Sequence, residues 1–275
     1  MKPFPRISSP GLGNAVRRRR STHDAAVQAI GIGIVNGRYP AGSLLPPSDE
    51  LLSALSMSRT TLREALQTLA AKGMIVARAK VGTRVLDEGH WNMFDADILE
   101  WRLATGIPAS FLSALFEVRQ SLEPVAAALA AARRTPEDVD RLRELANGLG
   151  LARRHFDEFV DADVLFHQFI LEVSRNPFMN SLGALISTAL RASFTLSAPA
   201  LRASFTMSAP LERQELSALV KRQHMDIVDA IEAGDPQAAN DAMMTVIRQG
   251  WINYSGQGYR VLARTEVATF QGEPA

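Results

Sequence analysis

The sequence predicts a mainly α-helical protein in two parts, an N-terminal winged helix-turn-helix followed by an all-helical bundle. Three observations predict it. Between residues 23 and 88, three helix signals precede a short basic hairpin. From Trp91 to about Ser255 strand signals vanish and apolar residues recur at helical spacing. The 275 residues and 47% hydrophobic content suffice for two cores in a globular protein.

The charge of the chain changes sign near residue 90. Residues 1–90 hold 13 Lys and Arg against 6 Asp and Glu, a net +7, whereas residues 91–275 hold 17 against 23, a net −6. A basic module joined to an acidic one suits a head that binds a polyanion. Because a solvated basic face has the same composition, charge alone does not decide between the two.

The first part begins with a predicted disordered basic arm, residues 1–22, which contains Arg17 to Arg20. The winged helix-turn-helix is predicted over residues 23–88. Its three helices are expected at 24–36, from Pro47 onward and at 58–71, and its two strands at 74–77 and 83–86.

The third helix carries the side chains expected to contact DNA. Leu62, Leu66 and Leu69 face inward, which leaves Arg59, Thr60 and Arg63 outward, and Ser58 is the expected N-cap. Base edges in the major groove are read from the first turns of such a helix. Lys80 and Arg84 on the hairpin are expected to reach the adjacent DNA backbone or minor groove. The predicted DNA-binding residues are Ser58, Arg59, Thr60, Thr61, Arg63, Lys80, Gly82 and Thr83.

Residues 89–100 are predicted to be a linker, residues 101–255 an all-helical domain and residues 256–275 a tail. Leu190 to Pro199 recurs almost unchanged as Leu201 to Pro210. The eleven-residue spacing is close to three helical turns, so a second copy can lengthen a helix without rotating the residues after it.

Four ionisable residues fall on the core faces of three predicted helices of this second part. They are Arg119, Asp163, His167 and His224. Arg119 lies in the middle of the core stripe predicted for a helix at 111–133, which consists of Leu112, Leu115, Phe116, Leu122 and Ala126. A buried charge costs several kcal/mol unless it is paired. An internal Arg–Asp pair with two hydrogen-bonded histidines would satisfy them, but convergence from three helices favours a ligand-binding site.

The first part resembles the DNA-binding domain of the GntR family. The resemblance rests on Gly42 to Pro46, Leu51, Ser58 to Leu66, Leu69, Gly73 and Gly82 to Val85. Where that family usually offers an arginine to DNA from its second helix, this chain has Asp49. The resemblance therefore implies a sequence-specific DNA-binding protein whose operator contacts differ at Asp49.

The second part resembles the FadR-type effector domain (FCD domain). The matching residues are Glu117 to Pro124, Asp163 to His167, Ser174 to Pro177, His224, Ala230-Ile231, Gly234-Asp235 and Ala242-Met243. The resemblance implies a divalent metal, Zn or Ni, on Asp163, His167 and His224, with a small carboxylate effector also held by Arg119. The family's last histidine position falls on Val246, so the metal site is incomplete, and a metal held by the other three residues would need water to complete its shell.

Without a metal, His167 and His224 would hydrogen-bond the effector's hydroxyls while Arg119 forks onto its carboxylate. The segment Trp91 to Trp101 is similar to that of regulators of sugar-acid catabolism, particularly galactonate repressors, which suggests a sugar-acid effector. The expected protein is a homodimeric repressor on pseudo-palindromic double-stranded DNA, released by its effector.

Two rival functions come from other classes. A metal-dependent enzyme would use Asp163, His167 and His224 as acid and base, but the sequence has no nucleophile motif, phosphate loop or HExxH. A nucleoid-type protein would be small and basic throughout. With no cysteine, disulfides and thiolate chemistry are excluded. No signal peptide or membrane-spanning run is evident, so a cytoplasmic location without a membrane partner is expected.

Overall fold

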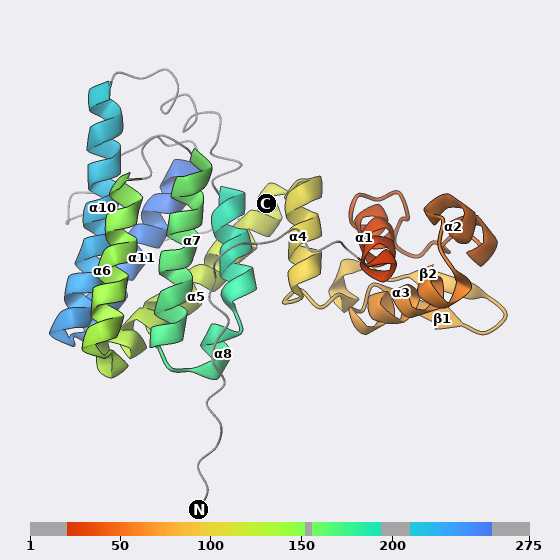
Figure 1. Ribbon diagram of the computed structural model, residues 1–275, viewed down its shortest axis with the longest axis horizontal. Coiled ribbons are helices and arrows are strands. Elements are labelled where there is room, and N and C mark those ends of the chain that lie inside the picture. Colours follow the sequence, from red (N-terminus) through yellow and green to blue (C-terminus); the bar gives the residue numbers. More distant parts are fainter. Residues whose placement is uncertain (1–20, 152–155, 194–209, 255–275) are drawn as a thin grey trace, which may run out of the picture. The chain divides into compact units, whose positions relative to one another are not determined.

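The computed structural model describes residues 21–151, 156–193 and 210–254 and divides into two compact units, Met1–Asn92 and Met93–Ala275 (Figure 1). The predicted basic arm up to residue 20, the tail from residue 256 and most of the duplicated stretch lie outside the described residues. Each unit buries apolar residues of its own.

The first unit contains the predicted three helices and hairpin. In chain order it has α1 (Thr22–Val35), α2 (Ser48–Leu55), α3 (Arg59–Ala71), β1 (Ile75–Arg78) and β2 (Gly82–Val85). The strands are antiparallel, with Ile75 opposite Val85 and Arg78 opposite Gly82. α1 packs against α3. The core of the unit includes Ile30, Leu51, Leu62, Leu69, Met74 and Val85.

Local chemistry sets the ends of these helices. Ser21 and Asp24 form a reciprocal capping box at the start of α1. α3 ends where the Gly73 N–H donates to the Ala70 carbonyl and the Met74 N–H to the Leu69 carbonyl, the paired bonds of a Schellman motif. Gly73 has φ +77°, and a Cβ there would lie 2.1 Å from the His90 carbonyl oxygen. Only glycine fits this position.

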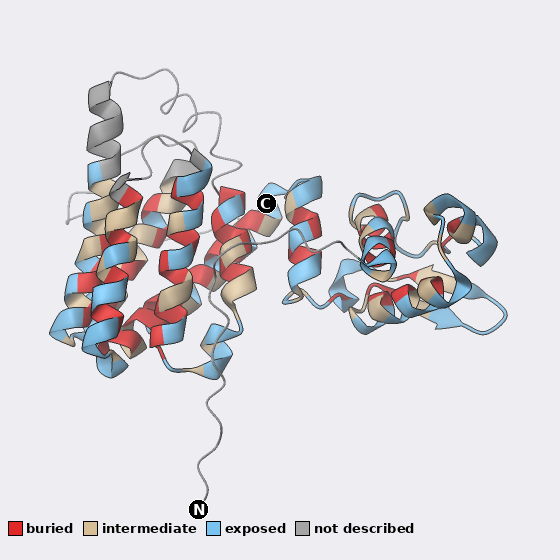
Figure 2. Ribbon diagram, viewed as in Figure 1, coloured by how far each residue is buried: buried red, intermediate tan, exposed pale blue. Residues whose placement is uncertain are grey.

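The second unit is helical throughout its described residues, as predicted. Its helices are α4 (Ala96–Thr105), α5 (Ala109–Arg133), α6 (Pro136–Leu151), α7 (Phe156–Val173), α8 (Pro177–Asn180), α10 (Pro210–Ala233) and α11 (Pro236–Tyr254), with a further helical segment at 183–193. α5 packs most extensively against α11 and also touches α7 and α10, while α6 packs against α7 and α10. Buried residues line the sides of the helices that face one another (Figure 2).

Part of the predicted linker is helical in the structure. The division between the units follows Asn92, within the stretch 89–100, but α4 already begins at Ala96. Asp95 caps this helix by accepting from the N–H groups of Asp97 and Ile98. Ile98, Leu99 and Trp101 are buried, so this stretch belongs in part to the helical domain.

One predicted core position in α5 is wrong. Leu122 is only half-buried, whereas Glu123 and Pro124 are buried beside it. The helix continues through Pro124. None of the helices in the described ranges has the length and apolar composition of a membrane-spanning segment.

Candidate functional site

The first turn of α3 presents the side chains that were predicted to contact DNA. Ser58 caps the helix, because its Oγ accepts from the Thr61 N–H at 3.1 Å. The same Oγ lies 2.8 Å from the Thr61 hydroxyl, and Thr61 is half-buried. Arg59, Thr60 and Arg63 are exposed. The outward surface of this turn is therefore two arginines and a threonine, with Ser58 and Thr61 engaged in shaping the helix end.

Asp49 contacts this surface from α2. Its Oδ1 accepts from Arg59 Nη2 at 2.9 Å, and the two side chains are 79% and 80% exposed. A pair this exposed adds little to stability. It places a carboxylate beside an arginine that was predicted to contact DNA.

The hairpin between β1 and β2 turns over residues 79–81. Lys80 occupies the left-handed region with φ +62° and is exposed, and Gly82 follows with φ +116°. Thr83 is half-buried. Arg84 donates from Nη1 to the Gly42 carbonyl at 2.9 Å, so this guanidinium is already engaged with the protein. Lys80 is the cation at the tip of the wing.

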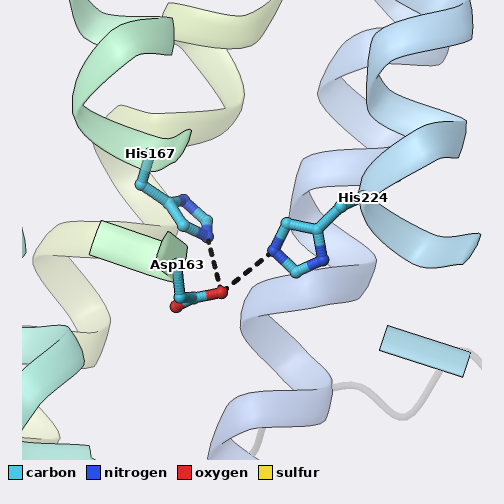
Figure 3. A group of neighbouring side chains, drawn as sticks. All are labelled: Asp163, His167 and His224. Atoms are coloured by element: carbon cyan, nitrogen blue, oxygen red, sulfur yellow. Dashed lines mark ion pairs between the residues drawn. The ribbon is translucent and has the colours of Figure 1, made fainter. Parts of the chain in front are cut away.

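The four ionisable residues predicted in the second unit meet in the core of the bundle. Arg119 comes from α5, Asp163 and His167 from α7, and His224 from α10, and each is at most 4% exposed. Figure 3 shows Asp163 between the two imidazoles. Its Oδ1 lies 3.1 Å from His224 Nε2 and 4.0 Å from His167 Nε2. The predicted convergence from three helices is present.

A fifth member of this cluster, Glu123, was not predicted as a site residue. It is 1% exposed, and its Oε1 accepts from Arg119 Nε at 2.5 Å. Its Oε2 lies 2.5 Å from His167 Nδ1 without forming an aligned hydrogen bond. Its spacing in the sequence could have indicated this position, because Glu123 follows Arg119 by four residues and therefore lies on the same side of the helix.

The Nδ1 partners of the two histidines orient their Nε2 atoms. His224 Nδ1 lies 2.8 Å from the Val220 carbonyl, which can only accept, so Nδ1 carries the proton. The Glu123 carboxylate favours the same tautomer at His167. Neither Nε2 has an aligned hydrogen bond. One atom each from Asp163, His167 and His224 lie within 4.8 Å of one another. The Asp163 carboxylate and the two Nε2 atoms, with each imidazole positioned through a contact at its Nδ1, fit a divalent cation.

The carboxylates of the cluster are held ionised. Burial raises the pKa of Glu123, but the Arg119 charge and the His167 contact together outweigh burial and lower the pKa to about 2. Burial likewise raises the pKa of Asp163, and the His224 contact with the charges of His167 and Arg119 brings it below its ordinary value. The cluster holds two carboxylates and one guanidinium, so histidines that bind a metal through neutral rings would leave it with one net negative charge.

Apolar side chains surround the cluster. The Phe166 ring stands edge-on to His224 with centroids 4.9 Å apart. Phe116 lies beneath the Arg119 guanidinium at 5.4 Å. Val246, at the position where the family resemblance expects a fourth ligand, is a partly buried residue packed on the core. A cation here would therefore have three protein ligands.

Comparison with known proteins matches both units. Residues 22–85 match the family described as "Bacterial regulatory proteins, gntR family", and residues 114–249 match the FCD domain. The chain is 31% identical over 218 residues to the uncharacterized HTH-type transcriptional regulator YieP of Escherichia coli, covering 78% of this chain and 87% of that protein. This chain belongs to the GntR family.

A second relative of this GntR-family protein is the galactonate operon transcriptional repressor of Escherichia coli. It is 30% identical over 224 residues, which cover 82% of this chain and 93% of the repressor. The solved structure of Lar from Listeria monocytogenes has the same fold, with a TM-score of 0.56 and 16% identity over 86% of this chain and 98% of Lar. The GntR-family chain is a DNA-binding transcriptional regulator, and the rival metal-dependent enzyme finds no support in these relatives.

Proposed function

We propose that this regulator is a repressor released from its operator when a small carboxylate binds to the buried cluster of the helical domain. The observation that carries the proposal is the convergence of Arg119, Glu123, Asp163, His167 and His224 in an apolar core. A purely structural network would give each buried Nε2 an aligned hydrogen-bond partner, yet the Nε2 atoms of both histidines lack one.

The charge of the cluster supports a divalent cation, Zn or Ni, on Asp163, His167 and His224. A cation of charge +2 would turn the net −1 of the cluster into +1. A single carboxylate would then bring the site to neutrality, with Arg119 offering it the guanidinium protons that Glu123 does not use. When bound, the metal would supply a Lewis-acidic position for one oxygen of the ligand.

The effector class is a sugar acid. The resemblance of the chain to the galactonate operon repressor supports this choice. The carboxylate of the sugar acid would bind Arg119, and the hydroxyls of the sugar acid would face the histidines. In the alternative without metal, His167 and His224 hydrogen-bond these hydroxyls directly, and the same arginine holds the carboxylate.

The DNA contacts follow from the first unit. Arg59, Thr60 and Arg63 would read base edges in the major groove, and Ser58 and Thr61 would hold the helix end against a phosphate. Lys80 at the wing tip, with Gly82 and Thr83 behind it, would contact the adjacent backbone. Two copies in a homodimer would occupy the two halves of a pseudo-palindrome.

The test combines metal analysis with ligand titration. Protein purified without chelator or histidine tag is expected to contain one Zn or Ni per chain, and Asp163→Asn much less. A panel of aldonic acids is then titrated into the wild type by calorimetry. Arg119→Lys keeps the charge but not the fork, so it is expected to weaken carboxylate binding at least 10-fold while the metal content is unchanged.

Absence of metal, with carboxylate binding intact, would favour direct hydrogen bonding by the histidines. If no sugar acid binds the wild type, or if Arg119→Lys binds it equally well, the proposed effector site is wrong.

A further inference from the structure

Asp49 and Arg59 form an exposed ion pair on the DNA-binding unit, and each side chain keeps polar atoms that the pair does not use. Asp49 lies in the first turn of α2, and Arg59 is the first residue of α3. The bond joins Asp49 Oδ1 to Arg59 Nη2 at 2.9 Å. Within the described part of the chain, Asp49 Oδ2 and Arg59 Nη1 bond to no other residue. The pair therefore presents a carboxylate oxygen and guanidinium donors to a ligand that meets this surface.

Fold stability does not account for a carboxylate at this position. An ion pair this exposed contributes little to the free energy of unfolding. An acidic residue in the first turn of a helix is favourable, but Glu50 supplies the same charge in the same turn of α2. A carboxylate on a surface that approaches DNA is also repelled by the phosphates. A hydrogen bond from a donor on the DNA would offset that repulsion.

The base edges of the major groove offer a carboxylate few donors. Guanine shows the acceptors N7 and O6 there, and thymine shows the acceptor O4 and a methyl group. The N6 amino donor of adenine lies beside its N7 acceptor, which repels a carboxylate, whereas the N4 amino donor of cytosine has no such neighbour on its own base. The base that suits Asp49 Oδ2 is therefore cytosine, and the base that suits the donors of Arg59 is guanine.

We propose that Asp49 determines operator specificity by accepting a hydrogen bond at Oδ2 from the N4 amino group of a cytosine, while Arg59 donates to a guanine. The inference rests on the reading of base edges by α3 in the proposed function. Asp49 Oδ1 stays bonded to Arg59, whose charge offsets the repulsion between the carboxylate and nearby phosphates. The acidic residue thus adds a base preference to the operator.

Selection from random duplexes with the full chain gives the operator first. We expect a cytosine in each half-site whose selection depends on Asp49. Asp49→Ala protein is expected to lose the preference at that base pair and to keep the rest of the operator. Glu50→Ala, in the same turn of α2, is the matched control and is expected to select the wild-type sequence.

Fluorescence anisotropy with two duplexes tests the contact at a single chemical group. In the second duplex, the cytosine of each half-site is replaced by a pyrimidinone base that lacks only the N4 amino group. The wild type is expected to bind this duplex at least about 10-fold more weakly than the operator. Asp49→Ala is expected to bind the two duplexes equally. Urea unfolding is the second readout, because a purely structural Asp49 would change the midpoint of unfolding and leave the ratio of the two affinities as in the wild type.

The outcomes separate this contact from the proposed function. If Asp49→Ala still selects the cytosine, or if the wild type binds both duplexes equally, Asp49 does not contact that base, while operator recognition by α3 stands. Loss of the guanine with retention of the cytosine would also overturn the contact, because Asp49 would then act only through Arg59. A wild type that selects no operator would overturn both this contact and the DNA contacts of the proposed function.

Discussion

Replacement of Glu123 by glutamine tests the buried ion network most sharply. The pKa of Glu123 falls from 4.5 to about 2 in the folded protein. At about 1.36 kcal/mol per pKa unit, this difference corresponds to roughly 3 kcal/mol of stability at pH 7. Removal of one partner from a buried ion pair costs about 3–5 kcal/mol, because the other charge, here Arg119, loses its hydrogen-bonded partner. Both routes give the same magnitude.

The assay is urea unfolding followed by circular dichroism at 222 nm. Glu123→Gln is expected to lower the free energy of unfolding by about 3 kcal/mol at pH 7. Glu144→Gln is the control: Glu144 is 68% exposed in its pair with Arg141, so a change within about 0.5 kcal/mol is expected. Because the folded-state pKa of Glu123 is lowered, its contribution is complete above pH 4.5 and is lost as the pH falls toward 2. A loss below about 1 kcal/mol, with the acid dependence of the wild type retained, would refute the network.

Three further predictions concern the DNA-binding unit. Gly73→Ala is expected to destabilise this unit by more than about 1 kcal/mol in thermal melts, whereas Gly148→Ala, in α6 with nothing within 4 Å of the added methyl, is expected to be neutral or stabilising by up to about 1 kcal/mol. Lys80→Ala is expected to weaken binding to all DNA sequences alike and to reduce the salt slope by about 1; an unchanged slope would remove Lys80 from the phosphate contacts. Asp49→Ala removes the carboxylate that pairs with Arg59. Operator selection is then expected to show weaker discrimination, by about 1–3 kcal/mol, at one base pair. An unaltered selected sequence would show that the pair with Asp49 does not affect how Arg59 contacts DNA.

Much of the fold was predictable because the local signals are strong. α3 begins after the Ser58 cap and ends at Ala71, as predicted, and the predicted order of three helices followed by a basic hairpin is confirmed. The first half of α4 was missed because residues 89–100 were assigned to a linker. Its cap at Asp95 and its buried Ile98, Leu99 and Trp101 show that tertiary packing continues the helical domain into that stretch.

The buried cluster was predictable in part. Arg119, Asp163, His167 and His224 stood out because ionisable residues interrupt apolar faces, and the structure brings them together. Glu123 did not stand out, since the apolar stripe of α5 was placed through its neighbour Leu122. One residue of helical rotation, about 100°, separates the two positions, and both are neighbours of Arg119 at i+3 and i+4, so spacing alone does not decide which of them is buried. The pairing of Glu123 with both Arg119 and His167 depends on the packing of α5 against α7, which spacing alone does not give.

Control of operator binding by a carboxylate in the helical domain is the central proposal for this regulator. Nuclease footprinting on the DNA upstream of the gene, with and without a panel of sugar acids, tests it most directly. We expect a protected pseudo-palindrome that loses protection with one of these acids, and Arg119→Lys protein that protects the same site but is not released. No protected palindrome at any salt concentration, or release of the Arg119→Lys protein at the wild-type effector concentration, would contradict this control.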